Sequence, residues 1–240
     1  MKEFDDFLQV VRRLRKECPW DRERTLQDMG EYLVEEAYEF LSAVREGKVE
    51  EVEEELGDVL LIFLMASVIL EERGRKIEDI IRKVKEKMIQ RHPHVFGEDV
   101  ARTGEEVLKK WEDRKKKGFY VERSLPALLR SWKLQEKAKR KGFDWESVDG
   151  VYDKIKEEVE ELRHAQEDLR EEEFGDLLFV VSHLGNFFKI NPEVALHRAC
   201  DKFQERFRRL EEEVKRMGKK IEEMTLQELD KIWERIKEEK

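Results

Sequence analysis

The chain has 240 residues, of which 45% are charged, and its formal net charge is −9. This acidic balance argues against nucleic-acid binding, which requires a basic surface. The longest apolar run, 59–70, is too short to cross a bilayer, and the chain opens without a signal peptide. We therefore expect a cytoplasmic protein with no membrane partner, in which Cys18 and Cys200 are reduced, buried thiols.

The composition also limits the fold class. Glu, Lys, Arg and Leu dominate the sequence and strands have little support, so the prediction is an all-α protein. A chain of this length could form one large domain or two of about 115 residues. Because the predicted elements occur twice in the same order, we predict a first repeat at 1–118, a linker at 119–125 and a second repeat at 126–240.

The first half begins with an amphipathic helix at 3–16. The stretch Cys18-Pro19-Trp20-Asp21 breaks this helix, since proline lacks a backbone donor and restricts the residue before it. Thr25 and Asp28 are placed to cap a helix that runs to about residue 46, where Gly47 ends it.

The third helix, at 49–72, becomes apolar on all sides over 59–70. A helix of this kind is buried on all sides, and a domain this small cannot surround it, so we expect a second copy of the chain to do so. A helix at 77–91 follows and ends at His92-Pro93-His94, which fits a turn better than a metal site. Thr103 is predicted to cap one more helix, through residue 115.

The second half repeats this order. A helix at 127–140 is followed by the turn Gly142-Phe143-Asp144-Trp145 and then by a pair of acidic helices. Asn191-Pro192 starts a long helix, and Thr225 with Glu228 caps the last one.

Each half carries an acidic string on one helix and Glu-x-x-Asp on the next. Carboxylates three residues apart share a helical face, so two antiparallel helices would bring four together. Such a cluster must take up protons or bind a cation, and oxygen ligands suit Mg²⁺ or Mn²⁺. The two predicted clusters are Glu36, Glu39, Glu55 and Asp58, and Glu158, Glu161, Glu173 and Asp176.

A single acidic string is weak support for a site, because 58 of the 240 residues are acidic and a solvated helix face would look the same. Four features occur in the same order in both halves: the acidic string, the hairpin, the Glu-x-x-Gly-Asp motif and the apolar helix. This recurrence favours a functional site. The hairpins differ in length: 15 residues separate Glu39 from Glu55, and 11 separate Glu161 from Glu173. We therefore predict that the second hairpin is about one helical turn shorter in total.

These motifs, together with CPWD, RRLR, RHPHVF, RSLPALLR and GFDW, resemble the tandem-domain MazG nucleoside triphosphate pyrophosphohydrolases over essentially the whole chain. The resemblance implies two tandem MazG-like helical repeats whose four-helix-bundle cores are completed in a homodimer. It also implies Mg²⁺-dependent cleavage of NTPs and dNTPs between the α and β phosphates, with Mn²⁺ as a substitute ion. The products would be NMP and pyrophosphate, and the role would be nucleotide-pool house-cleaning.

The resemblance also assigns residues. It makes both carboxylate clusters metal ligands, with Glu158 and Glu161 in the catalytic group. Glu157 and its equivalent Glu35 are candidates to orient the attacking water or to take its proton. The implied nucleotide contacts are Lys202, Arg206, Trp233 and Lys237, with Lys87, Arg91, Trp111 and Lys115 as their counterparts in the first repeat.

These contacts predict broad base specificity. Trp233 offers a stacking face that tolerates any base, and no Asn or Gln lies among the assigned residues to read a base edge. Since the second repeat also keeps the full basic and aromatic set, we expect it to carry most of the activity.

Two other classes of protein fit parts of the sequence. Glu161-Leu162-Arg163-His164 has the Glu-x-x-His form of a di-iron carboxylate bundle, although the residue equivalent to His164 in the first repeat is Ser42. The chain could also be a non-catalytic helical interaction protein whose acidic faces are merely solvated.

Overall fold

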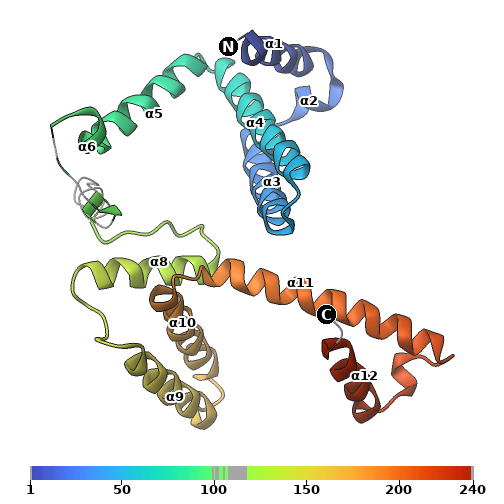
Figure 1. The fold of residues 1–240 in the computed structure, drawn as a ribbon. Helices are drawn as coiled ribbons and strands as arrows, with labels where there is room; N and C mark the ends of the chain where they lie inside the picture. The colour runs from blue at the N-terminus through green and yellow to red at the C-terminus, as the bar shows by residue number, and fades with distance from the viewer. Residues whose placement is uncertain (1, 99, 101–102, 105, 108–117, 239–240) are drawn as a thin grey trace. The chain divides into compact units, whose positions relative to one another are not determined.

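The computed structural model describes residues 2–98, 100, 103–104, 106–107 and 118–238. Helices are the regular structure of these residues, with no strand among them, which confirms the all-α prediction (Figure 1). The chain divides into two compact units, 1–114 and 115–240. The stretch around this division lies largely outside the described residues, so the predicted linker and repeat boundaries stay predictions.

The first unit is built around one hairpin of long helices. Its elements are α1 (Lys2–Glu17), α2 (Pro19–Glu23), α3 (Leu26–Glu46), α4 (Val49–Glu71), α5 (Ile77–Arg91) and α6 (Pro93–Phe96). The α4 helix packs on both α3 and α1, and the core between them includes Val11, Met29, Leu64 and Met65. The expected break at Cys18 occurs, but the residues after it form the short helix α2, because Pro19 at the first helical position has a favourable φ and needs no donor.

The ends of α3 match the sequence prediction. The Thr25 side chain accepts from the Asp28 backbone N–H, and the Asp28 carboxylate accepts from the Thr25 N–H at 2.6 Å. Gly47 follows the helix with φ +72°, a left-handed conformation that favours glycine. These two ends set the length of α3 and therefore the position of its carboxylates along the hairpin.

The apolar half of α4 is not covered on all sides within the first unit. Leu64 is fully buried, whereas Phe63 is 36% exposed and Leu56 is 52% exposed. Both line an apolar groove between α3 and α4, together with Leu33 of α3. This leaves an apolar face of the first unit that the unit itself does not bury.

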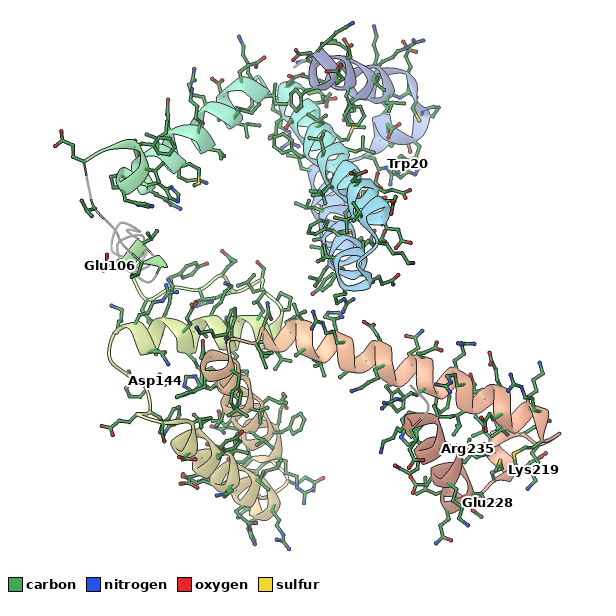
Figure 2. All side chains as sticks on the ribbon, in the orientation of Figure 1. Trp20, Glu106, Asp144, Lys219, Glu228 and Arg235 are labelled. Atoms are coloured by element: carbon green, nitrogen blue, oxygen red, sulfur yellow. The ribbon has the colours of Figure 1, made fainter. Side chains whose placement is uncertain are left out.

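The second unit has the same hairpin and a longer extension. Its elements are α8 (Ala127–Arg140), α9 (Val148–His164), α10 (Arg170–Phe188), α11 (Pro192–Arg216), the 3₁₀ turn η1 (Ile221–Glu223) and α12 (Leu226–Glu238). The α10 helix packs on α9 and α8, and α12 folds back on α11 (Figure 1). Ion pairs join Arg235 to Glu213 and Lys219 to Glu228 at this far end (Figure 2).

The predicted caps of the second unit are present. The Asn191 side chain accepts from two backbone N–H groups at the start of α11, and Thr225 and Glu228 exchange side-chain bonds with each other's backbone N–H. In the first unit, the Glu106 N–H donates to Thr103 Oγ1, while most of the helix predicted through residue 115 lies outside the described residues.

The two hairpins differ in how their length is distributed. The first has 7 helical residues after Glu39, a 2-residue connection and 6 helical residues before Glu55. The second has 3 helical residues after Glu161, a 5-residue connection and 3 helical residues before Glu173. Each helical limb of the second hairpin is thus about one turn shorter than its counterpart in the first. The longer connection makes up part of this difference in chain length.

The cysteine prediction is wrong in one respect. Both thiols are free, as expected, but Cys200 is exposed and Cys18 is partly exposed, because neither lies on the core face of its helix or turn. Among the described residues, the helices are too short or too polar for any of them to span a bilayer.

Candidate metal centres

The hairpin of the second unit gathers its carboxylates at one point. Glu158 of α9 and Glu173 and Asp176 of α10 each offer an oxygen within 4.8 Å of the others. Glu158 is 4% exposed, and Lys154 Nζ lies 2.8 Å from its Oε1. Its Oε2 is buried with no hydrogen-bond partner. Because an unsatisfied buried acceptor costs about 1–3 kcal/mol, and more when charged, this oxygen is placed to bind a cation.

Glu161 belongs to the same electrostatic group. Burial raises the pKa of Glu173 above its ordinary value, and the charges of Glu161, Glu158 and Asp176 raise it further. The other three carboxylates predicted for this site therefore all act on Glu173. A cation among them would relieve this repulsion and favour the ionised form of Glu173.

The first unit has an equivalent cluster. Glu36 and Glu39 of α3 and Glu55 of α4 also offer oxygens within 4.8 Å of one another. The Oε2 of Glu55 is buried without a partner. Burial raises the pKa of Glu36, with further contributions from the charges of Asp58, Glu39 and Glu55. The fourth predicted ligand, Asp58, is thus also close to the group.

The donor set of both clusters suits a hard cation. Among the described residues, no histidine joins either group of oxygens. His164 is instead exposed and donates from Nδ1 to the Glu160 carbonyl at 2.8 Å. Ligands that are all carboxylates are typical of Mg²⁺ or Mn²⁺, and they do not match the Glu-x-x-His pairs of a di-iron bundle.

One residue of this site was missed by the sequence reasoning. Lys154 bridges two carboxylates, with Nζ 2.6 Å from Glu157 Oε1 and 2.8 Å from Glu158 Oε1. These bonds raise the pKa of Lys154, so it is a fixed positive charge at the cluster. The sequence carried a signal for this contact, because Lys154 lies three residues before Glu157 and four before Glu158. In the first unit, Tyr32 lies four residues before Glu36, so that cluster lacks this charge.

The residues assigned to nucleotide contact lie at the α11–α12 end of the second unit. The Trp233 ring is 5.3 Å from the Phe203 ring and packs against the core between these helices. Lys237 Nζ is 2.7 Å from Glu234, and Lys202 is exposed, while Arg206 is half-buried. None of the contacts found for the described residues joins this set to the carboxylates of the same chain. In the first unit, Lys87 and Arg91 lie on α5, and Trp111 and Lys115 lie outside the described residues.

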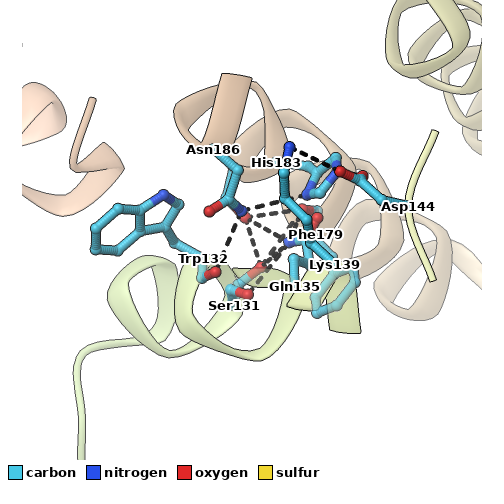
Figure 3. A network of polar contacts seen from close by, with 9 residues as sticks. Ser131, Trp132, Gln135, Lys139, Asp144, Phe179, His183 and Asn186 are labelled. Atoms are coloured by element: carbon cyan, nitrogen blue, oxygen red, sulfur yellow. Dashed lines mark hydrogen bonds and ion pairs between the residues drawn. The ribbon is translucent and has the colours of Figure 1, made fainter. Parts of the chain in front are cut away.

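A buried polar network between α8 and α10 was also missed (Figure 3). Gln135 of α8 donates from Nε2 to the Ser182 hydroxyl at 3.0 Å, and Asp144 accepts from His183 at 2.7 Å. Gln135, Ser182 and His183 are all buried. The signal was present as polar residues at i,i+4 within apolar faces, at Ser131 and Gln135 and at Ser182 and Asn186.

Comparison with known proteins connects these clusters to a family. A protein named nucleoside triphosphate pyrophosphohydrolase/pyrophosphatase MazG, from Thermotoga maritima, is 40% identical over 98% of this chain and 95% of its own length. This chain belongs to the MazG family. The family model described as the MazG nucleotide pyrophosphohydrolase domain matches residues 24–96, which include the first carboxylate cluster.

Other relatives agree. The nucleoside triphosphate pyrophosphohydrolase of Escherichia coli K12 is 35% identical over 99% of this chain and 98% of its own length. A crystal structure of a mazG-related protein from Thermotoga maritima is 32% identical and covers 47% of this chain and 99% of its own, with a TM-score of 0.42. The resemblance predicted from the motifs is confirmed, and membership places this chain among hydrolases and not among non-catalytic interaction proteins.

The raised pKa of Glu173 predicts a pH dependence for the metal-free protein. A carboxyl group whose pKa is higher in the folded state binds its proton more readily there, so its ionisation lowers the free energy of unfolding as pH rises through the folded value. Glu173→Gln removes this ionisation. In EDTA, the variant should gain thermal stability over the wild type at about pH 7 and lose most of that gain at about pH 4.5.

The measurement is thermal unfolding by circular dichroism at both pH values. Glu172→Gln, on the exposed side of the same turn, is the matched control and should show a much smaller gain. A gain for Glu173→Gln that is independent of pH would contradict the electrostatic account.

Proposed function

We propose that this chain hydrolyses nucleoside triphosphates, both NTPs and dNTPs, at the α–β phosphate bond to NMP and pyrophosphate, and that it requires Mg²⁺. The observation that carries this proposal is the pair of carboxylate clusters, each with a buried, unpartnered Glu oxygen. Membership of the MazG family and the names of the relatives support the reaction type. The cellular role would be removal of unwanted nucleotides in the cytoplasm.

The residues that would hold the ion in the second unit are Glu158, Glu161, Glu173 and Asp176. Bound there, Mg²⁺ would supply charge neutralisation for the phosphates and acidify a water molecule. Glu157 is the nearby carboxylate outside this set, and Lys154 fixes its position at 2.6 Å. We propose that Glu157 orients the water or accepts its proton, with Glu35 in the same role in the first unit.

Basic side chains would balance the negative charge of the substrate phosphates. Lys202, Arg206 and Lys237 are proposed to contact phosphate or sugar oxygens, with Lys87 and Arg91 as counterparts, and Trp233 is proposed to contact the nucleotide beside them. Arg can bind phosphate in a bidentate manner, whereas Lys acts as a point charge. None of these groups is suited to read a particular base, so we propose broad base specificity.

The assembly is proposed to be a homodimer. The groove between α3 and α4 leaves Phe63, Leu33 and Leu56 partly exposed, and α10 presents Leu178 and Val181 at 42% exposure each. Apolar faces on the central helix of each unit are what a second copy would cover to complete the helical bundles.

The reaction itself is tested by product analysis. With Mg²⁺ and ATP, the protein should release AMP and pyrophosphate in equal amounts, and excess EDTA should abolish both. Separation of the products by ion-exchange chromatography is the measurement. ADP and orthophosphate as the main products would contradict cleavage at the α–β bond.

The two clusters are expected to contribute unequally. Glu158→Ala should remove most pyrophosphate release, because it deletes the buried ligand that Lys154 orients, whereas Glu36→Ala should cost less. The measurement is kcat at saturating ATP and Mg²⁺ for both variants. Glu160→Ala, an exposed carboxylate on α9, is the control. Equal decreases in kcat for Glu158→Ala and Glu36→Ala would show that the two units contribute equally to catalysis.

Dimer formation is tested at the groove of the first unit. Phe63→Glu places a charge on the proposed interface and should shift the protein from dimer toward monomer or unfolded chain. Light scattering with circular dichroism measures mass and helicity together. Val44→Glu, at an exposed valine outside the groove, should leave the dimer intact. A wild-type protein that is monomeric with full helicity would refute the assembly.

A further inference from the structure

Lys154 places a positive charge directly on the carboxylates of the second unit. Its Nζ lies 2.6 Å from Glu157 Oε1 and 2.8 Å from Glu158 Oε1, so one ammonium group spans two acidic side chains of α9. Within the described part of the chain, no Lys or Arg forms an ion pair with the other three carboxylates of this cluster. Lys154 is therefore the cation that the ligand-free cluster has.

The contact with Glu158 differs from an ordinary surface ion pair. The Glu158 side chain is 6% exposed and that of Lys154 is 32% exposed, whereas Lys156 and Asp153 on the same helix pair at 76% and 75% exposure. Water and salt screen an exposed pair strongly and a buried carboxylate much less. The charge of Lys154 therefore acts on the cluster at close to its full effect.

The two carboxylate oxygens of Glu158 have different surroundings. Oε1 is paired with Lys154, whereas Oε2 is buried without a hydrogen-bond partner. A metal ion bound through Oε2 would share this carboxylate with the ammonium group. At separations of roughly 5 Å, repulsion between a monovalent and a divalent cation amounts to about a tenfold change in affinity even at the dielectric constant of water.

The first unit has no charge at the equivalent position. Tyr32 takes the place of the lysine, four residues before the first glutamate ligand of α3. Its ring stacks on Trp20 at 6.0 Å between centroids, and its hydroxyl accepts from Arg24 Nη1 at 3.5 Å. Tyr32 is thus held by the turn after α1 and by the core of the first unit.

No other basic group replaces the missing charge. Lys48, at the turn of the first hairpin, pairs with Glu46 and Glu51. As far as the structure describes this unit, its four cluster carboxylates form no ion pair with Lys or Arg. The buried, unpartnered Oε2 of Glu55 is therefore open to a metal ion that no neighbouring cation repels.

We propose that Lys154 is a built-in counter-ion that weakens the binding of divalent cations to the second cluster. In the substrate-free protein, the first cluster then binds a cation about tenfold more tightly than the second. The proposal rests on the proposed function, because it takes both clusters as metal centres of that reaction. The first unit would keep its ion between turnovers, whereas the second would take up its ion together with the triphosphate, whose negative charge offsets Lys154.

The test measures metal binding without any nucleotide. Mn²⁺ is titrated into the full chain, and the free ion is followed by its electron paramagnetic resonance signal. The wild type should show two classes of site that differ about tenfold in affinity. Glu36→Gln should remove the tighter class, and Glu158→Gln should remove the weaker one.

The decisive variant is Lys154→Met, which removes the charge and keeps most of the length of the side chain. It should tighten the weaker class about tenfold and leave the tighter class unchanged. Lys156→Met removes an exposed lysine of the same helix and should bind Mn²⁺ as the wild type does. A variant that only disturbed the fold would lose affinity, so a gain in affinity separates the charge effect from a structural one.

The reciprocal change is made in the first unit. Tyr32→Lys should weaken the tighter class, whereas Tyr32→Phe, which removes the hydroxyl group alone, should leave it unchanged. Tyr32 packs against the core, so circular dichroism is used to check that both variants keep their helicity. The result for Lys154→Met does not depend on this pair.

The outcomes separate this proposal from the proposed function. Equal affinities of the two clusters, no Mn²⁺ binding without nucleotide, or unchanged binding in Lys154→Met overturns the role of Lys154, even in a protein that releases pyrophosphate. A tenfold difference that Lys154→Met removes, in a protein that releases no pyrophosphate from any triphosphate, supports the role of Lys154 and refutes the proposed function instead.

Discussion

The structure depends on the repulsion between carboxylates that each hairpin forces together. Three carboxylates come within 4.8 Å of one another in each hairpin, with a fourth close enough to act on them, and burial and neighbouring charge raise the pKa of Glu173 and Glu36. Such an arrangement lowers the stability of the metal-free fold. It persists because the apolar halves of the same helices bury enough surface to hold the hairpins closed, and a cation bound there would relieve the repulsion.

The apolar halves of α4 and α10 therefore pack on a neighbouring helix and also position the carboxylates. In the first unit, Leu64, Met65 and Val68 pack on α1 and set the position of Asp58, which lies one to three turns away on the same helix. In the second unit the corresponding stretch packs on α8, yet it uses Ser182, His183 and Asn186, which must all be hydrogen-bonded to be buried. A rigid polar network of this kind positions groups more strictly than an apolar core, at the expense of tolerance to substitution.

Local patterns in the sequence were sufficient for the elements and for three of the four carboxylates in each hairpin. The i,i+3 spacing of Glu158 and Glu161, the cap at Thr25 and the turn at Gly47 each depend on residues within a few positions, and the structure has them where the pattern indicated. The buried polar network between α8 and α10 could not be found in this way. It needs Gln135 to meet Ser182 across 47 residues of sequence, and a contact of that range has no periodicity to reveal it. Lys154 was overlooked for a different reason, since its pairing is local but resembles ordinary surface solvation.

The two units share their carboxylate clusters and differ in the side chains that surround them. Each unit keeps a cluster of carboxylates with an unpartnered buried oxygen, on Glu55 in one and on Glu158 in the other. The second adds Lys154 at its cluster and packs α10 on α8 through the hydrogen-bonded side chains of Gln135 and Ser182. Buried polar groups cost stability unless they are paired, and the bonds of Gln135 to Ser182 and of His183 to Asp144 supply that pairing. The first unit has an apolar core between α1 and α4 instead, and the fixed hydrogen bonds of the second unit therefore position its hairpin more strictly.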